Sequence, residues 1–174
     1  MKKALLALIF AVLPMLSLAA GGYVHLDKAN VNLSDEKSLQ RGAKYFVNYC
    51  LSCHSASYMR YNRMAEDLGI PEDLVQKDLM FAADKIGDTM DVAMTAEDGE
   101  KWFGTAVPDL TVVARARGAD WLYTYLRSFY VDEKRLFGVN NTVFPDVGMP
   151  HVLWELQGMQ KAVYKTEKDA DGNE

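Results

Sequence analysis

The feature that most constrains this chain is the sequence Cys50-Leu51-Ser52-Cys53-His54. Two thiols at this spacing can each form a thioether with one vinyl group of haem, and the histidine that follows is placed to bind the iron. The pattern Cys-x-x-Cys-His therefore predicts c-type haem attachment. Cys50 and Cys53 are the only cysteines of the chain. If both carry haem, no disulfide and no free thiol remain.

Two other kinds of site also use closely spaced cysteines. A structural zinc site takes four ligands, usually from two separated pairs, and this chain offers one cysteine pair with His25 and His151 far away in the sequence. A thioredoxin-like redox pair follows a strand inside a βαβ unit. The residues before Cys50 have a helical pattern instead, and a redox pair would leave His54 without a function. Haem attachment is the better interpretation.

The N-terminus has the layout of a secretory signal peptide, which we place at residues 1–20. Lys2 and Lys3 precede an apolar run at 4–13, and small residues end the segment. A retained membrane anchor is the alternative, but the run is shorter than the ~20 apolar residues of a spanning helix, and Pro14 interrupts it. We expect cleavage and export, with the remainder on the periplasmic face of a bacterial inner membrane or in an equivalent compartment.

The net charge of the chain indicates what kind of molecule it binds. There are 24 acidic and 19 basic side chains, and removal of Lys2 and Lys3 with the signal leaves 17 basic ones and a net charge of -7. This balance argues against nucleic-acid binding and for a basic partner. Eleven acids lie between Glu66 and Glu100, with two lysines. The stretch is either a solvated face or a surface on which a cationic redox protein docks.

One domain is predicted after the signal, at residues 21–164, followed by a polar tail at 165–174. Residues 21–33 have the composition of an extended arm. The sequence at 34–36 then supplies an N-cap with acids in the first turn. Apolar residues recur at helical spacing from Leu39 to Cys50, which predicts an amphipathic helix that ends at the haem motif.

Three further segments are predicted along the chain. A second short helix runs from about Glu72 to Ala83, and the sequence from Trp102 to Leu110 is typical of loop and turn. Asp120 then caps a helix with an apolar stripe from Trp121 to Phe129. Such a stripe is core in most proteins, and beside a haem it can also line the cofactor.

A second axial ligand of the iron is expected from a methionine or a histidine. Met149 stands between Gly148 and Pro150, and a ligand loop needs a backbone that these two residues restrain. The motif favours Met149. The alternatives are Met90, Met94 and His151.

Haem also carries two propionates, and a carboxylate of this kind is bound best by the planar guanidinium of arginine. Arg115 and Arg117 both follow the predicted loop. The residues themselves do not distinguish between the two, and either could be an ordinary surface side chain.

Several segments together resemble the cytochrome c1 family, the c-haem subunits of the ubiquinol:cytochrome c reductase. The resemblance extends from about Tyr23 to Gln160 and is carried by residues 38–44, 48–62, 85–90, 108–110, 114–118 and 147–150. It implies a mainly α-helical c-type cytochrome fold with long loops and one covalent haem c.

The same resemblance implies the roles of individual residues. Cys50 and Cys53 hold the haem, and His54 and Met149 ligate the iron. Arg117 and Pro108 are the further cofactor-binding residues that the resemblance implies, Arg117 through a propionate.

The implied function is electron transfer between proteins. By resemblance the donor is the Rieske iron-sulfur protein, the acceptor is a cytochrome c, and quinol is oxidised in the neighbouring cytochrome b. The chain then needs no catalytic acid, base or nucleophile of its own. A haem-dependent peroxidase or gas sensor is the alternative, but it requires a five-coordinate iron, which the methionine loop disfavours.

The C-terminus departs from the family. Its members continue past the methionine into another amphipathic helix and a single membrane anchor, whereas residues 165–174 are polar and no run of ~18 apolar residues follows the signal. We therefore expect a fragment without the C-terminal helix and the anchor. In a complete chain we expect that helix to cross the first one at Gly42 and Phe46.

Overall fold

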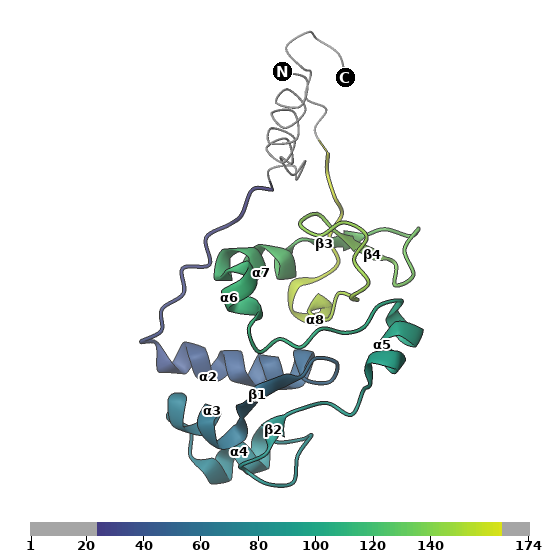
Figure 1. Cartoon of the computed structure of the whole chain (residues 1–174). Helices are drawn as coiled ribbons and strands as arrows, with labels where there is room; N and C mark the ends of the chain where they lie inside the picture. The colour runs from purple at the N-terminus through teal and green to yellow at the C-terminus, as the bar shows by residue number, and fades with distance from the viewer. Residues whose placement is uncertain (1–23, 165–174) are drawn as a thin grey trace, which may run out of the picture.

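The computed structural model describes residues 24–164, so the predicted signal at 1–20 and the polar tail at 165–174 lie outside the described residues. The described chain consists of short helices and two two-stranded sheets joined by long loops (Figure 1). The expected mainly helical fold with long loops is confirmed.

None of the helices within residues 24–164 is long and apolar enough to cross a membrane.

The first long helix ends where the haem motif begins. Helix α2 covers Glu36–Tyr45, and Asp35 caps it by accepting a hydrogen bond from a backbone amide of the first turn. A π-helical turn, Phe46–Cys50, follows, in which Leu51 N donates to Phe46 O at 2.9 Å. π-Turns inside helices occur often at functional sites. The predicted cap and the predicted end of the helix are both confirmed.

The segment at 56–90, which follows the motif, forms the lower half of the molecule with α2 in Figure 1. Its elements are β1 (Ala56–Arg60), α3 (Tyr61–Asp67), α4 (Glu72–Asp78) and β2 (Thr89–Met90). β1 pairs antiparallel with β2. With the end of the first helix these elements enclose a hydrophobic cluster, here called the first core: Val47, Leu51, Ala56, Tyr61, Met64, Ala65, Val75, Leu79 and Met90.

The second predicted helix is shorter than expected. α4 ends at Asp78 rather than at Ala83. Leu79 leaves the helical conformation, with φ -132° and ψ -4°, and its side chain is buried in the first core. The turn at Leu79 therefore allows burial of this residue, and residues 80–88 return towards β2 as a loop.

The upper half of the molecule contains the remaining elements except α5 (Figure 1). They are α6 (Val113–Arg117), α7 (Ala119–Arg127), β3 (Phe129–Val131), β4 (Val139–Asn141) and α8 (Trp154–Gln157). β3 and β4 are antiparallel, with Phe129 opposite Asn141. Phe129, Val139 and Val147 form the second core, against which Tyr125 and Met149 pack.

The prediction of a loop at Trp102 and Phe103 was wrong. Trp102 and Phe103 end a helix, α5 (Ala96–Phe103), rather than lying in a loop. A capping box between Thr95 and Asp98 starts this helix, and Gly104 ends it with φ 74°. The pattern Thr-x-x-Asp was the signal in the sequence that this helix begins here.

Asp120 does not cap α7 as predicted, because it lies within the first turn and Gly118 occupies the cap position. Its carboxylate accepts hydrogen bonds from the Ala29 amide at 2.9 Å and from Lys28 Nζ at 2.8 Å. Asp120 thus holds the N-terminal arm, which contains no helix or strand between residues 24 and 32.

Candidate haem site

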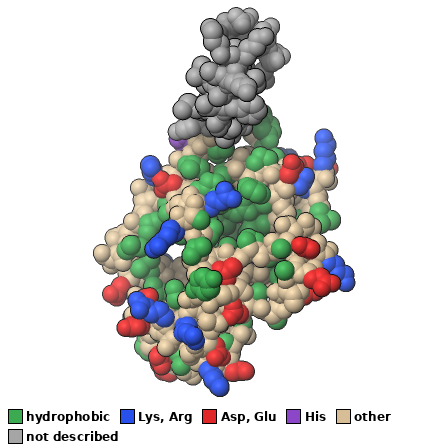
Figure 2. All heavy atoms as spheres, viewed as in Figure 1, with side chains coloured by type: hydrophobic (Ala, Val, Ile, Leu, Met, Phe, Trp, Pro, Cys, Tyr) green, Lys and Arg blue, Asp and Glu red, His purple; other side chains and the backbone are tan. Residues whose placement is uncertain are grey.

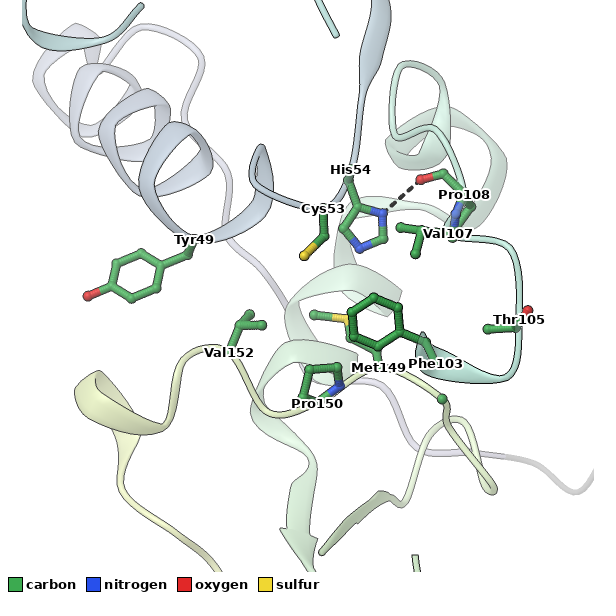
Figure 3. A pocket seen from close by; sticks show the side chains of 11 residues that line it. Tyr49, Cys53, His54, Phe103, Thr105, Val107, Pro108, Met149, Pro150 and Val152 are labelled. Atoms are coloured by element: carbon green, nitrogen blue, oxygen red, sulfur yellow. Dashed lines mark hydrogen bonds between the residues drawn. The ribbon is translucent and has the colours of Figure 1, made fainter. Parts of the chain in front are cut away.

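A cavity that is open to solvent is lined by residues from both halves of the molecule. Figure 3 shows the side chains of Cys53, His54 and Met149 converging on it. The lining residues are Tyr49, Cys53, His54, Phe103, Thr105, Val107, Pro108, Gly148, Met149, Pro150 and Val152. None of these is acidic or carries an ammonium or guanidinium group. The sequence thus brings the cysteine motif and the methionine loop, almost a hundred residues apart, to one site.

The His54 ring is oriented by the backbone of the opposite loop. Its Nδ1 lies 2.7 Å from the carbonyl oxygen of Pro108 (Figure 3). A carbonyl oxygen can only accept, so Nδ1 carries the proton in this hydrogen bond and Nε2 of the neutral ring keeps its lone pair. Such a hydrogen bond fixes the tautomer and orientation of a metal-binding histidine. Pro108 therefore acts through its carbonyl group.

The loop that carries Pro108 is tied to β1 by Asp109. The Asp109 carboxylate accepts hydrogen bonds from Ser57 N and Oγ, both at 2.9 Å, and from Thr111 N at 2.8 Å. Desolvation opposes ionisation of this carboxyl, but the hydrogen bonds from Thr111 and Ser57 outweigh it and lower the pKa of Asp109 to about 2. Leu110 N also donates to Ser55 O at 2.8 Å. This network fixes the position of the Pro108 carbonyl.

The two cysteines lie in a tight turn after the π-helical segment. Cys53 N and His54 N both donate to Cys50 O, at 3.0 and 2.8 Å. Both thiols are half-buried, and they form no disulfide with each other. Burial raises the pKa of Cys50, and the charge of a neighbouring Cys53 thiolate raises it further. Of the two, Cys53 lines the cavity.

Among the candidates for the second axial ligand, Met149 alone lines the cavity with His54. Met90 is 2% exposed and belongs to the first core. His151 is buried against Phe129, with parallel rings whose centroids are 5.0 Å apart, and burial lowers the pKa of His151. Met94 is half-buried and is not among the lining residues.

The Met149 loop approaches the opposite wall closely at Gly148. A Cβ at this position would lie 3.1 Å from Phe103 O and 3.1 Å from Thr105 Cγ2, closer than side chains normally pack. On the other side, the Tyr125 hydroxyl donates a hydrogen bond to Met149 Sδ at 3.3 Å. The sequence predicted the restrained loop but not Tyr125, because that residue belongs to an apolar stripe with no visible polar function.

Asn141 holds the start of this loop and was also missed. It is 1% exposed. Its side-chain oxygen accepts from Val143 N at 2.9 Å and Phe144 N at 3.1 Å, and its Nδ2 donates to Tyr125 O at 2.8 Å. Asn141 therefore joins α7 to the loop that carries Met149. Single-sequence reasoning treats such an asparagine as an ordinary loop residue.

The two arginine candidates are both exposed and neither lines the cavity. The Arg117 guanidinium lies over the Trp121 ring, 5.1 Å from its centroid. Trp121 in turn stacks on Tyr125, with centroids 4.9 Å apart and an interplanar angle of 8°. Arg117 is thus connected to the cavity wall through two aromatic rings.

The residues present fit a haem. The donor set is an imidazole and a thioether, a pair that occurs in cytochromes c, and a vinyl-reactive thiol lies beside them. The walls of the cavity are mainly apolar, as in other cofactor sites. The chemistry of these side chains therefore suits a large, flat, mostly apolar cofactor that contains iron.

Comparison with known proteins decides the family, because the model of the Cytochrome C1 family matches residues 27–161. The chain belongs to the cytochrome c1 family. The cytochrome c1 of Allochromatium vinosum is 54% identical over 172 residues, covering 99% of this chain and 70% of that protein. A protein of Nitrosomonas europaea named ammonia monooxygenase gamma subunit is 52% identical, covering 91% of this chain and 67% of that protein. The cytochrome c1 of Rhodospirillum rubrum is 27% identical.

Cytochromes c1 carry one covalently attached haem c and transfer electrons as subunits of the bc1 complex, with cytochrome b and the Rieske protein. The predictions of family, cofactor and electron-transfer function are confirmed. In bacteria, subunits of this family face the periplasm.

Proposed function

We propose that Cys50 and Cys53 hold the haem as thioethers and that His54 and Met149 are its axial ligands. The observation that carries this proposal is the single cavity that His54, Cys53 and Met149 line together. When bound, haem c supplies an iron that changes between ferric and ferrous states by one electron. A haem iron ligated by both His54 and Met149 would have no open coordination position for a substrate.

The part played by the protein is orientation and exclusion of water. The Pro108 carbonyl holds the proton on His54 Nδ1, which leaves Nε2 free to bind a metal. Phe103, Val107 and Val152 give the cavity apolar walls. A neutral, soft thioether favours ferrous iron and raises the reduction potential. Met149 therefore suits a protein that accepts electrons readily.

We also propose that Arg117 contacts a haem propionate. The proposal is supported by the position of its guanidinium over the Trp121 ring, because Trp121 stacks on Tyr125, which contacts Met149. A guanidinium can form two parallel hydrogen bonds to a carboxylate. This exposed side chain must move to reach the propionate, because it does not line the cavity.

The acceptor that we propose is a basic cytochrome c. This is supported by the acidic residues at 66–100, where eleven acids accompany two lysines. Opposite charge speeds the encounter of two proteins more than it strengthens their complex.

We further propose export through the signal at residues 1–20, so that the domain at 21–164 functions in the periplasm.

The name of the Nitrosomonas relative describes that protein, and we do not extend monooxygenase activity to this chain. The alternative function, a peroxidase or a gas sensor, would require an open coordination position on the iron. Ligation by Met149 would fill that position.

A pyridine haemochrome spectrum of the purified holoprotein tests the attachment. Two thioethers give the spectrum of haem c, whereas Cys50→Ala or Cys53→Ala should give the shifted spectrum of a single thioether and far less folded protein. Ser52→Ala, between the two cysteines, is the matched control and should attach haem normally. A protein that folds normally and contains no covalent haem would contradict the proposal and favour thiol-disulfide exchange.

A further inference from the structure

The Met149 sulfur has a hydrogen-bond donor of its own. The Tyr125 hydroxyl lies 3.3 Å from Met149 Sδ. A thioether has no hydrogen to give and is a weak acceptor, so the hydroxyl is the donor. The sulfur carries two lone pairs, and this hydrogen bond occupies one of them.

The Tyr125 ring is held by three other aromatic side chains. The Trp121 ring stacks parallel to it, with ring centroids 4.9 Å apart. The Phe129 and Phe144 rings form T-shaped contacts with it, at centroid distances of 5.4 and 6.5 Å. The Tyr125 carbonyl is bound by Asn141 Nδ2 at 2.8 Å. Ring and backbone are therefore both fixed, and the direction of the hydroxyl is built into the fold before any ligand binds.

We propose that Tyr125 is a positioning residue that sets the reduction potential of the site through Met149. This rests on the proposed ligation by Met149. A hydrogen bond to the sulfur draws lone-pair density away from the metal side, which weakens a thioether more as a ligand of ferric than of ferrous iron. The bond also leaves only the second lone pair free, so that it fixes which side of the sulfur is presented to the cavity.

The test is a spectroelectrochemical titration of the holoprotein with Tyr125→Phe, which removes the hydroxyl and keeps the stacked ring. The hydrogen bond is a weak one, so we expect the redox equilibrium to shift about three- to tenfold towards the oxidised form. For a one-electron couple this is a potential lower by about 28 to 59 mV. The far-red absorption band of iron-methionine ligation should remain.

The matched control is Tyr123→Phe on the same helix. Tyr123 is 39% exposed and lies under the Arg127 guanidinium, away from the Met149 contact. The reduction potential of the Tyr123→Phe holoprotein should equal that of the unmodified protein. A Tyr125→Phe protein with the band intact and the potential of the control would overturn the proposal. Loss of the band with haem still attached would also contradict it, because the methionine ligand itself would then be lost rather than only its hydrogen bond.

A second measurement leaves the packing of the protein unchanged. Replacing tyrosine by 3-fluorotyrosine throughout makes each hydroxyl a stronger donor, so the potential should rise in the unmodified sequence and not in Tyr125→Phe. An equal response in both proteins would exclude Tyr125 as the cause. Absence of the far-red band from the unmodified protein would show first that the ligation by Met149 fails, and the inference would fail with it.

Discussion

Asp109 accepts hydrogen bonds from both the amide and the hydroxyl of Ser57, each at 2.9 Å. One carboxylate thereby ties the loop on one side of the cavity to strand β1, which follows the cysteine motif. The residue before Asp109 supplies the carbonyl that orients His54. The position of the imidazole therefore depends on a charged group that does not itself line the cavity.

Replacement of Asp109 should destabilise the protein in a pH-dependent way. Its pKa is lowered from 3.8 to about 2, so its contribution is fully present above pH 3.8 and is lost as the pH falls through 2. At pH 7 we expect Asp109→Asn to lower the free energy of unfolding by about 1 kcal/mol, because solvent screens this exposed group. Denaturant unfolding of the holoprotein at several pH values measures the difference, which should shrink with acidification.

Asp84→Asn is the control for this experiment, because Asp84 is an exposed acid in the loop after α4. It should leave stability almost unchanged. If the free energies of unfolding of Asp109→Asn and the unmodified protein differ by a constant amount from pH 7 down to pH 2, the role of the charge is contradicted.

Asn141→Ala should be among the most destabilising changes outside the haem motif. The side chain is 1% exposed and makes three hydrogen bonds, to Tyr125, Val143 and Phe144. Leaving buried backbone groups unpaired costs about 1 to 3 kcal/mol each, so we expect a loss of about 3 kcal/mol or more in urea unfolding. Asn48→Ala removes one exposed hydrogen bond to Lys44 O and should cost under about 0.5 kcal/mol. Similar losses in the two variants would be inconsistent with this account.

Part of the site was predictable because its signals are local. The cysteine motif, the N-cap of α2 and the restrained Met149 loop each depend on a few adjacent residues. Asn141 and Tyr125 were missed because their partners lie 16 and 24 residues away in the chain. Strands β3 and β4 have three residues each, too few for a periodic pattern. Their pairing depends on the packing of the second core.

The role of Gly42 can be tested by substitution. A Cβ at this position would meet no atom within 4 Å, and alanine is preferred over glycine inside a helix by about 1 kcal/mol. We expect Gly42→Ala to raise the unfolding temperature of the holoprotein. Gly148→Ala, where the Cβ would lie 3.1 Å from Phe103 O, should lower it. A lower temperature for Gly42→Ala would mean that another part of the chain crosses the helix here.

The acidic residues at 66–100 are predicted to make electron transfer depend on salt. Figure 2 shows acidic side chains over the lower half of this face, among several lysines and arginines. Charges are screened beyond about 8 Å at 0.15 M salt, so the rate with a basic cytochrome c should fall as salt rises. Asp84→Lys with Glu100→Lys should slow the reaction at low salt and flatten its dependence.

Glu133→Lys is the control for these reversals, since Glu133 is an exposed acid outside the stretch. It should retain the salt dependence of the unmodified protein. If the rate does not change with salt or with the reversals at 84 and 100, the stretch is only a solvated face.

The most direct test of the central claim is the far-red absorption of the oxidised holoprotein, compared with Met149→Ala. Iron-methionine ligation gives a weak charge-transfer band in this region, and a neutral sulfur ligand raises the potential. We predict that Met149→Ala keeps its covalent haem, loses the band and has a much lower potential, whereas Met159→Ala, 52% exposed beyond α8, retains both. A Met149→Ala protein with the band and the potential of the unmodified chain would contradict ligation by Met149.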